Sequence, residues 1–422
     1  MDPIPSLLAF LDRSPCPAFA ADNLEHDLRA AGFTALEPTA PRWGLAPGRY
    51  LVRSGAAVVA FVLRSAAVRR YALIGAHTDS PHLRLKPNAG HACAGCLQLG
   101  VEVYGGVLTN SWLDRDLGLA GTVYTEDGRA HRVRISRPLA RVAQLAIHLD
   151  RKINDEGLKL NPQLHLAPLW GLDRGTDAGE EFRALLATAA EVEASAITGH
   201  DLSLVDLTPA TRGGVRNEFI FSGRLDNLAS CHAGLLALLA ATDGPADTVP
   251  VLACFDHEEV GSQSRDGAEG GLLATTLERV ALELGLDRGA HLAALASSLM
   301  ISADMAHAAH PNYVDRHEPH HKPLLGAGPV LKSNHNQRYA TSGATAAHLR
   351  GLARRHGLPL QDFVTRSDLG CGSTIGPACA ARLGVAVADV GAPMLSMHSA
   401  RECAAAEDHR TSIALLTAHL VG

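Results

Sequence analysis

The sequence lacks any apolar run close to the roughly 18 residues that a membrane-spanning helix needs, so we expect no such helix. Its first residues also lack the basic region, apolar core and cleavage site of a secretory signal, and we expect none. Basic residues are not in excess, because 38 Lys and Arg face 44 Asp and Glu and the net charge is −6. This balance gives no reason to expect a nucleic acid or an anionic membrane as a partner.

Cysteine is sparse, and the eight cysteines are scattered, several of them inside apolar runs. Such usage is typical of buried thiols in a reducing compartment and not of a disulfide framework, so we expect a cytoplasmic protein. Cys93 and Cys96 form a lone C-x-x-C motif. Because a zinc ribbon needs a second pair of ligands, this motif does not favour one.

At 422 residues the chain is too long for one ordinary core, so we expect two domains or one domain with a large insertion. Residues 1–85 and 218–422 carry buried apolar strands and helical patterns. Between them, segments such as 101–104 and 121–124 alternate apolar and polar residues, as half-buried antiparallel strands do. The pattern predicts a discontinuous α/β domain with a β-rich domain inserted at 86–217.

One stretch organises the α/β part of the chain. Apolar residues 249–255 predict a buried strand, and it ends in ionisable residues that include Glu258 and Glu259. Sites in α/β proteins lie at the carboxyl ends of strands. Because successive side chains of an extended segment point to opposite sides, one glutamate can hold a metal while the other reaches a bound water. Taken alone, the stretch is equally well a charged loop.

Other element ends carry similar side chains. An apolar run over 71–76 ends in His77 and Asp79, which share a face of an extended segment. Asp79 is therefore able to fix the tautomer of a metal-bound His77. Ionisable residues at further strand ends, or at the start of a helix, are Asp226, Asp304 and His398.

This set of side chains suits divalent metal ions. The chain has 22 histidines, and the candidates comprise two imidazoles, several carboxylates and no thiolate. Such donors fit a pair of ions, zinc first, with Mn²⁺ or Co²⁺ as alternatives. A two-metal site needs a bridging carboxylate and a base beside the bridging water. Glu258, which adjoins a candidate ligand, fits the base.

Several motifs lie in order over most of the chain, at 77–81, 112–116, 145–149, 223–227, 256–262, 302–307, 336–340, 371–377 and 397–402. They resemble the aspartyl aminopeptidases, a family of cytosolic co-catalytic dizinc metallopeptidases. The resemblance implies a zinc-peptidase-like three-layer αβα catalytic domain and an inserted β-rich dimerisation domain. It also implies removal of an N-terminal residue, with Asp or Glu preferred, from peptides with a free N-terminus. The implied assembly is a homo-oligomer, a dodecamer built from dimers.

The resemblance also implies ligands for two Zn²⁺ per subunit. Asp226 would bridge the ions. His77 and Asp304 would complete the coordination of one ion, and Glu259 and His398 that of the other.

Further roles follow from the same resemblance. Asp79 would orient His77, and Glu258 would be the general base. His148 would lie near the active site of a neighbouring subunit or, alternatively, act as a zinc ligand. Acid specificity needs a cation near the substrate side chain. Lys332 is the candidate, with His335 near it in sequence, and the alternative is a solvated surface lysine.

Two other functions share much of this chemistry. A dizinc carboxypeptidase or amide deacylase would use the same metals and differ only in its pocket. A structural assembly protein with an inactive site is the non-enzymatic alternative, but it would not need a base beside its metal. The histidine-rich residues 307–335 predict a solvated or substrate-facing loop, with a second metal site as the alternative.

Overall fold

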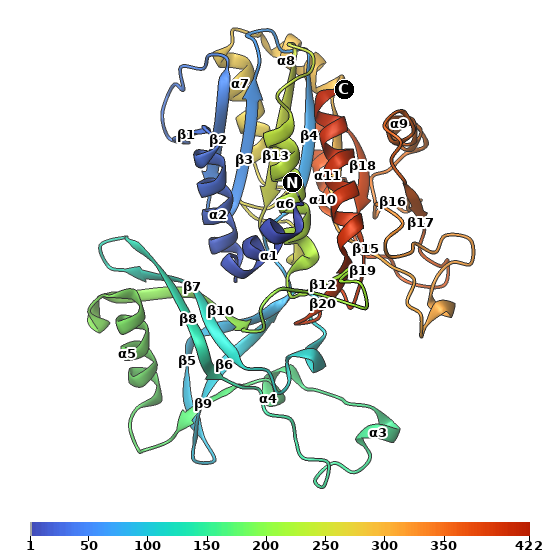
Figure 1. The fold of residues 1–422 in the computed structure, drawn as a ribbon. Helices are drawn as coiled ribbons and strands as arrows, with labels where there is room; N and C mark the ends of the chain where they lie inside the picture. The colour runs from blue at the N-terminus through green and yellow to red at the C-terminus, as the bar shows by residue number, and fades with distance from the viewer. Residues whose placement is uncertain (1) are drawn as a thin grey trace. The chain divides into compact units, whose positions relative to one another are not determined.

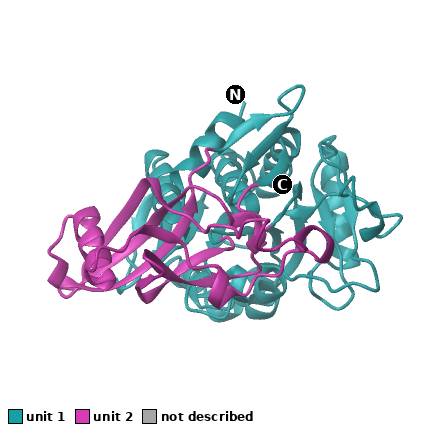
Figure 2. Ribbon diagram, turned by 90° about the horizontal axis from the view of Figure 1, so that it is seen from below, with its two compact units in different colours: residues 1–79, 210–397, 402–422 teal, residues 80–209, 398–401 magenta. Residues whose placement is uncertain are grey.

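The computed structural model describes residues 2–422, and the chain divides into two compact units, shown in teal and magenta in Figure 2. The first unit runs to Asp79 and resumes over Ala210–Met397 and Glu402–Gly422. The second unit comprises Ser80–Pro209 and His398–Arg401. The sequence pattern predicts an insertion at 86–217, with His398 outside it.

The first unit is built on a sheet that has nine strands among residues 2–422, in the order β1-β2-β3-β13-β4-β14-β18-β16-β17 (Figure 1). The strands are β1 (Thr34–Leu36), β2 (Gly48–Ser54), β3 (Ala57–Leu63), β4 (Arg70–His77), β13 (Thr248–Phe255), β14 (Leu299–Ala303), β16 (Val330–Lys332), β17 (Gln361–Phe363) and β18 (Ala386–Gly391). The pairs β13–β4, β4–β14 and β14–β18 are parallel. The carboxyl ends of these four central strands therefore lie at one edge of the sheet.

Helices cover both faces of this sheet, which gives three layers. One face packs against α1 (Ile4–Arg13), α2 (Pro17–Ala30), α6 (Leu225–Ala240), α9 (Gly343–Arg355) and α11 (Ala406–Val421). The other face packs against α7 (Leu272–Glu283), α8 (Arg288–Ala296) and α10 (Ile375–Leu383). Every residue of β13 is buried, because alternate side chains enter the two cores. A strand buried on both faces is a continuous apolar run in the sequence. The expected αβα domain is confirmed.

A smaller sheet of the first unit gathers short strands that continue from the large one. In spatial order they are β11 (Thr211–Gly213), β12 (Phe219–Ser222), β20 (Glu402–Ala405), β19 (Pro393–Leu395) and β15 (Ala306–His307). β15 follows β14 in the chain, β19 follows β18, and β12 leads into α6. This sheet therefore ties together the segments that leave the carboxyl edge.

The second unit is the expected β-rich one. Its antiparallel sheet comprises β8 (Ala130–Ala140), β7 (Leu117–Thr125), β10 (Ile197–Asp206), β5 (His82–Cys93), β6 (Cys96–Tyr104) and β9 (Leu169–Leu172). Helix α5 (Ala178–Ala190) packs on it through Phe182 and Leu186. Between β8 and β9 the described residues form two short helices, α3 (Ile153–Glu156) and α4 (Pro162–His165). Across residues 2–422, no helix combines the length and the apolar character that crossing a bilayer requires.

Candidate metal centre

The carboxyl edge of the large sheet brings several of the predicted side chains together. His77 ends β4 and pairs in register with Phe255, the last residue of β13. Glu258 and Glu259 follow β13 in the short helix η3 (Glu258–Val260). Because neighbouring parallel strands end at the same level, these side chains and Asp304, which follows β14, start from adjacent positions.

The Nε2 atom of His77 is the centre of the cluster. It lies 3.6 Å from Oδ1 of Asp226, 3.7 Å from Oδ1 of Asp304 and 3.9 Å from Oε2 of Glu258. Two ligands bound at about 2.0–2.1 Å to one tetrahedral ion lie roughly 3.4 Å apart. The separations from His77 to the two aspartates are close to this value. A second group, in which ligand atoms lie within 4.8 Å of one another, joins His77 to Glu258 and Glu259.

Asp79 holds the cluster from behind. Its carboxylate accepts the backbone N–H groups of Glu258 and Glu259, each at 3.1 Å. The Nδ1 atom of His77 lies 3.3 Å from Oδ1 of Asp79 and donates to the carbonyl oxygen of Asp79 at 3.1 Å. Nδ1 therefore carries the proton, and Nε2 is the nitrogen that faces the carboxylates. Asp79 thus fixes the histidine tautomer through its carbonyl and carboxylate oxygens, and its carboxylate also fixes the turn that carries the glutamates.

Asp226 is positioned by partners from distant parts of the chain. It lies near the start of α6 with φ −81° and ψ 104°, outside the helical range. Its N–H donates to Oε2 of Glu402 at 3.2 Å, and the Asn227 side chain donates to the carbonyl of Ala303 at 2.9 Å. Glu402 is itself buried. The sequence does not predict Glu402 or Asn227 as site residues, although both lie in the matching motifs.

Lys332 is buried beside Asp304, with only 2% of its surface exposed. Its Nζ donates to the carbonyls of Asp304 at 2.9 Å and Met305 at 3.1 Å, and lies 3.5 Å from Oδ2 of Asp304. Burial alone would raise the pKa of Asp304, but the Lys332 charge and the nearby His77 hold that pKa well below its usual range. Lys332 therefore keeps Asp304 ionised, and a role in reading substrate charge stays a prediction.

The cluster carries an excess of negative charge. Burial raises the pKa of Glu258 to about 8; His77 opposes the rise, and nearby carboxylates including Asp304 add to it. Burial and the charge of Asp226 likewise raise the pKa of Glu259. A divalent cation would neutralise this charge. An imidazole with several carboxylates and no thiolate fits zinc, with manganese or cobalt as alternatives.

Three further predicted residues are His398, His148 and His335. His398 belongs to the second unit, where its Nδ1 donates to the carbonyl of Gly106 at 2.9 Å. Nε2 is then the ring nitrogen suited to bind a metal. His148 is exposed in the segment between β8 and β9, and His335 is exposed in the loop after β16. The roles of all three stay predictions.

Two cavities of the first unit have charged side chains in their linings. One, of about 540 Å³, is lined by Glu258. The other, of about 320 Å³, is lined by Tyr339 and by the basic side chains of His307, His310, Arg316, His317 and Arg366. His307, His310 and His317 of the histidine-rich stretch thus line this cavity, and the substrate-facing role of the stretch stays a prediction.

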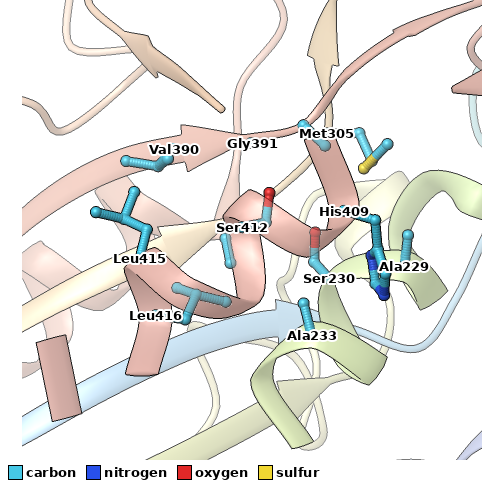
Figure 3. Close-up of a pocket in the computed structure, with 12 residues that line it drawn as sticks. Ala229, Ser230, Ala233, Met305, Val390, Gly391, His409, Ser412, Leu415 and Leu416 are labelled. Carbon is cyan, nitrogen blue, oxygen red and sulfur yellow. The ribbon is translucent and has the colours of Figure 1, made fainter. Parts of the chain in front are cut away.

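A third cavity lies in the core of the first unit, where α6 and α11 face β18 (Figure 3). Its lining is mainly apolar, with Ser230, His409 and Ser412 as the polar side chains. Its volume of about 20 Å³ has room for one water and none for a substrate.

Known proteins resemble the chain over nearly its whole length. The family model of the Aminopeptidase I zinc metalloproteases (M18) matches residues 10–420. A probable M18 family aminopeptidase 2 of Streptomyces avermitilis is 45% identical over 405 residues, which cover 95% of this chain and 94% of that protein. The solved structure of Ape4 in complex with Nbr1 matches with a TM-score of 0.93 and 38% identity, covering 98% of this chain and 84% of that one. The S. cerevisiae mApe1 dodecamer matches with a TM-score of 0.85 and 26% identity, covering 99% and 96%.

These matches confirm the family that the sequence motifs indicated. They agree with the histidine and the carboxylates gathered at the carboxyl edge of the sheet. The chain therefore belongs to the M18 family of zinc metallo-aminopeptidases.

Proposed function

We propose that the chain removes the N-terminal residue, preferably Asp or Glu, from peptides with a free N-terminus. It does so with two Zn²⁺ per chain and Glu258 as the general base. The observation that carries the proposal is the set of three carboxylates within 4 Å of Nε2 of His77, those of Asp226, Asp304 and Glu258.

The proposed ligands are those implied by the family resemblance. Asp226 would bridge the ions, His77 and Asp304 would complete one site, and Glu259 and His398 would complete the other. The separations around His77 support the first site, and the hydrogen bonds on both Nδ1 atoms support Nε2 as the ligand atom of each histidine. When bound, the ions lower the pKa of water and polarise the carbonyl of the scissile bond. Mn²⁺ and Co²⁺ are alternatives.

Glu258 moves the proton. The backbone N–H of Glu258 donates to Asp79, which fixes the main chain at this residue. The Glu258 side chain is 13% exposed, so its carboxylate reaches solvent. The Glu258 carboxylate accepts the proton of the attacking water as the C–O bond forms. It then returns this proton to the leaving amine as the C–N bond breaks, which releases an amino acid and a shortened peptide.

The preference for acidic residues is supported by the charge around the 320 Å³ cavity. Arg316 and Arg366 line it together with one acidic side chain, that of Glu318, and Arg366 also pairs with Asp368 at 2.7 Å. The Lys332 ammonium lies behind Tyr339, 5.1 Å from its ring centroid. A cationic cavity of this kind suits a carboxylate side chain. We propose Lys332 and His335 as the residues that read the substrate.

A panel of aminoacyl reporter substrates tests the proposal. The zinc-loaded enzyme should cleave aspartyl and glutamyl substrates at least about ten-fold better in kcat/KM than alanyl or lysyl ones, as one charge-assisted contact allows. Lys332→Met should lower kcat/KM for the acidic substrates selectively. An equal loss for neutral substrates would show that Lys332 acts only through Asp304. Faster cleavage of the lysyl substrate by the wild type would contradict the proposed specificity.

We propose that the chain forms a homo-oligomer, a dodecamer built from dimers, through the second unit. Its segment between β8 and β9 exposes Leu145 by 57%, Leu149 by 75% and Leu164 by 71%. Exposed leucines clustered in one segment mark an interaction surface. A second copy of the chain is the proposed occupant, because the related mApe1 is a dodecamer.

His148 lies within this apolar segment, and we propose that it acts in the active site of a neighbouring subunit. Glu258→Gln and His148→Ala homomers should then each be nearly inactive. Mixed under conditions of subunit exchange, they should regain part of the activity, because some sites would combine an intact Glu258 with an intact His148. No recovery despite proven exchange would place His148 in its own subunit's site or in a structural role.

We also propose a cytoplasmic location. All eight cysteines are free thiols, and each lies among residues 2–422. Such usage is typical of a reducing compartment. Thiol titration of protein taken directly from cells should find these cysteines reduced, and stable disulfides would contradict the proposal.

A further inference from the structure

The cavity of about 540 Å³ extends from Glu258 along one face of α10. Its walls come from the loop after η3, including Ser262 and Glu269, and from Thr374 to Arg382. Thr374 caps α10, and Arg382 lies in the last turn of that helix. The volume falls in the range of about 300–1,000 Å³ of cavities that bind small ligands. None of these residues is a proposed metal ligand.

The chemistry of peptide cleavage assigns this cavity to one side of the substrate. A base that takes a proton from water and returns it to the leaving nitrogen must lie within hydrogen-bond reach of that nitrogen. The nitrogen belongs to the residue that follows the scissile bond. The leaving peptide therefore starts beside Glu258, and the cavity that Glu258 lines provides its path.

The dimensions of α10 set the length of peptide that the cavity holds. From Thr374 to Arg382 the helix rises roughly 12 Å, at about 1.5 Å per residue. An extended peptide advances about 3.3–3.6 Å per residue, so this distance corresponds to roughly three residues. The carboxylate of a leaving tripeptide would then come close to Arg382.

Arg382 provides a positive charge at this end of the cavity. It is exposed, and within residues 2–422 it forms no hydrogen bond or ion pair. Arg350, also at the surface of the first unit, is by contrast paired with Asp362 at 2.6 Å. Among the described residues that line the cavity, Arg382 is the one cation, and Glu269 does not lie within ion-pair distance of it. A guanidinium is suited to bind a carboxylate with two parallel hydrogen bonds.

We propose that the cavity binds the leaving-peptide side of the substrate and that Arg382 pairs with the C-terminal α-carboxylate of short peptides. This inference rests on the proposed function, because it takes Glu258 as the base. The enzyme then favours peptides of about four residues with a free C-terminus. Longer peptides continue past Arg382 and gain nothing from it.

The test compares the peptide Asp-Ala-Ala-Ala with its C-terminal amide. The wild type should cleave the free acid about three- to ten-fold better in kcat/KM, as expected for one partly exposed charge pair. Arg382→Gln should bring this ratio close to one. Arg354→Gln is the matched control, because Arg354 is an exposed arginine in the last turn of α9, and this variant should keep the wild-type ratio.

A second measurement uses the wild type alone. The ratio of free acid to amide should fall to about one for a peptide of eight residues. No preference at four residues, the same preference at eight, or an unchanged ratio in Arg382→Gln would overturn the inference. Failure of the wild type to cleave either peptide or an aspartyl nitroanilide would instead overturn the proposed function, and the inference with it.

Discussion

Apolar side chains are usually buried and charged side chains exposed, and the two units depart from this distribution in opposite ways. The first unit buries charged groups, including His77 and Asp304, at the edge of its large sheet. The second unit exposes apolar groups, including Leu149 and Leu164, between β8 and β9. Each departure costs free energy unless something binds there. The difference indicates what binds: metal ions for the buried charges, and another protein surface for the exposed leucines.

The two regions also differ in how they are held. Asp79 and Glu402 fix the buried cluster through backbone hydrogen bonds that join distant parts of the chain. The segment between β8 and β9 has two helices of four residues each among its described residues. The cluster around His77 is thus arranged by the fold of the first unit, whereas the apolar segment needs its partner to be covered.

The largest expected effect comes from a substitution that removes the proposed base and leaves the other residues of the buried cluster in place. Glu258→Gln should retain both metals and lose about 10²–10⁴ in kcat, because the amide cannot accept a proton from water. Metal analysis and steady-state kinetics on the same sample check this. Glu278→Gln, on the surface of α7, is the control and should behave as wild type. Full activity of Glu258→Gln with full metal content would remove Glu258 from the mechanism.

The second-largest effect is expected from a substitution of Asp79, the residue that orients His77. Asp79→Asn should lower zinc affinity about 10–100-fold, because partners that orient a ligating histidine typically contribute that much. Competition with a chromogenic chelator measures the affinity. Unchanged affinity would show that His77 does not depend on Asp79 for its orientation.

A charge in the apolar segment tests the second half of the comparison. Leu149→Glu should weaken assembly about ten-fold or more per contact, because burial of a leucine contributes about 1.5–3 kcal/mol. Sedimentation velocity over a range of concentrations measures the shift to smaller species. Zinc binding at His77 and Asp226 should persist in the separated subunits. An unchanged oligomer would show that this segment is not the interface.

The smallest expected effect concerns a buried polar pair for which no metal is proposed, His232 and His409. Nδ1 of His232 lies 3.0 Å from Nε2 of His409, and Nε2 of His232 lies 3.0 Å from the Ser6 hydroxyl. Burial lowers the pKa of His232 to about 4, so the unfolded chain takes up its proton first as the pH falls. The contribution of His232 to the free energy of unfolding is therefore fully present above about pH 6.5 and is lost as the pH falls towards 4.

From pH 7 to pH 6 the free energy of unfolding should fall by roughly 0.7 kcal/mol because of His232. Urea unfolding of the wild type and His232→Gln at both pH values measures it. Glutamine keeps hydrogen-bonding capacity and does not titrate, so the variant should show the smaller pH dependence. Equal pH dependence would mean that His232 does not contribute.

Much of the large sheet could be predicted because its strands are buried on both faces. Such strands are apolar throughout and end abruptly, so 249–255 and 71–76 located β13 and β4 together with the ionisable residues after them. The short strands of the small sheet, such as β15 with two residues, carry no such pattern. Its existence depends on contacts between distant segments.

The partners within the site could not be predicted for a related reason. Glu402 accepts from the N–H of Asp226 across 176 residues, and Asp79 accepts from Glu258 across 179. No periodicity links such positions. Lys332 shows the same limit, because its place at a strand end predicts a nearby site but not that its ammonium is bound to the carbonyl of Asp304. His398 likewise groups with the second unit through Gly106, a contact that the sequence does not reveal.

Zinc titration of the metal-stripped protein tests the central claim most directly. Release of the first residue from Asp-Ala-Ala-Ala should rise with added zinc and level off at two equivalents per chain, while the N-acetylated peptide stays intact. Full activity without bound metal, or equal cleavage of the acetylated peptide, would contradict a metal-dependent aminopeptidase site at the carboxyl edge of the sheet.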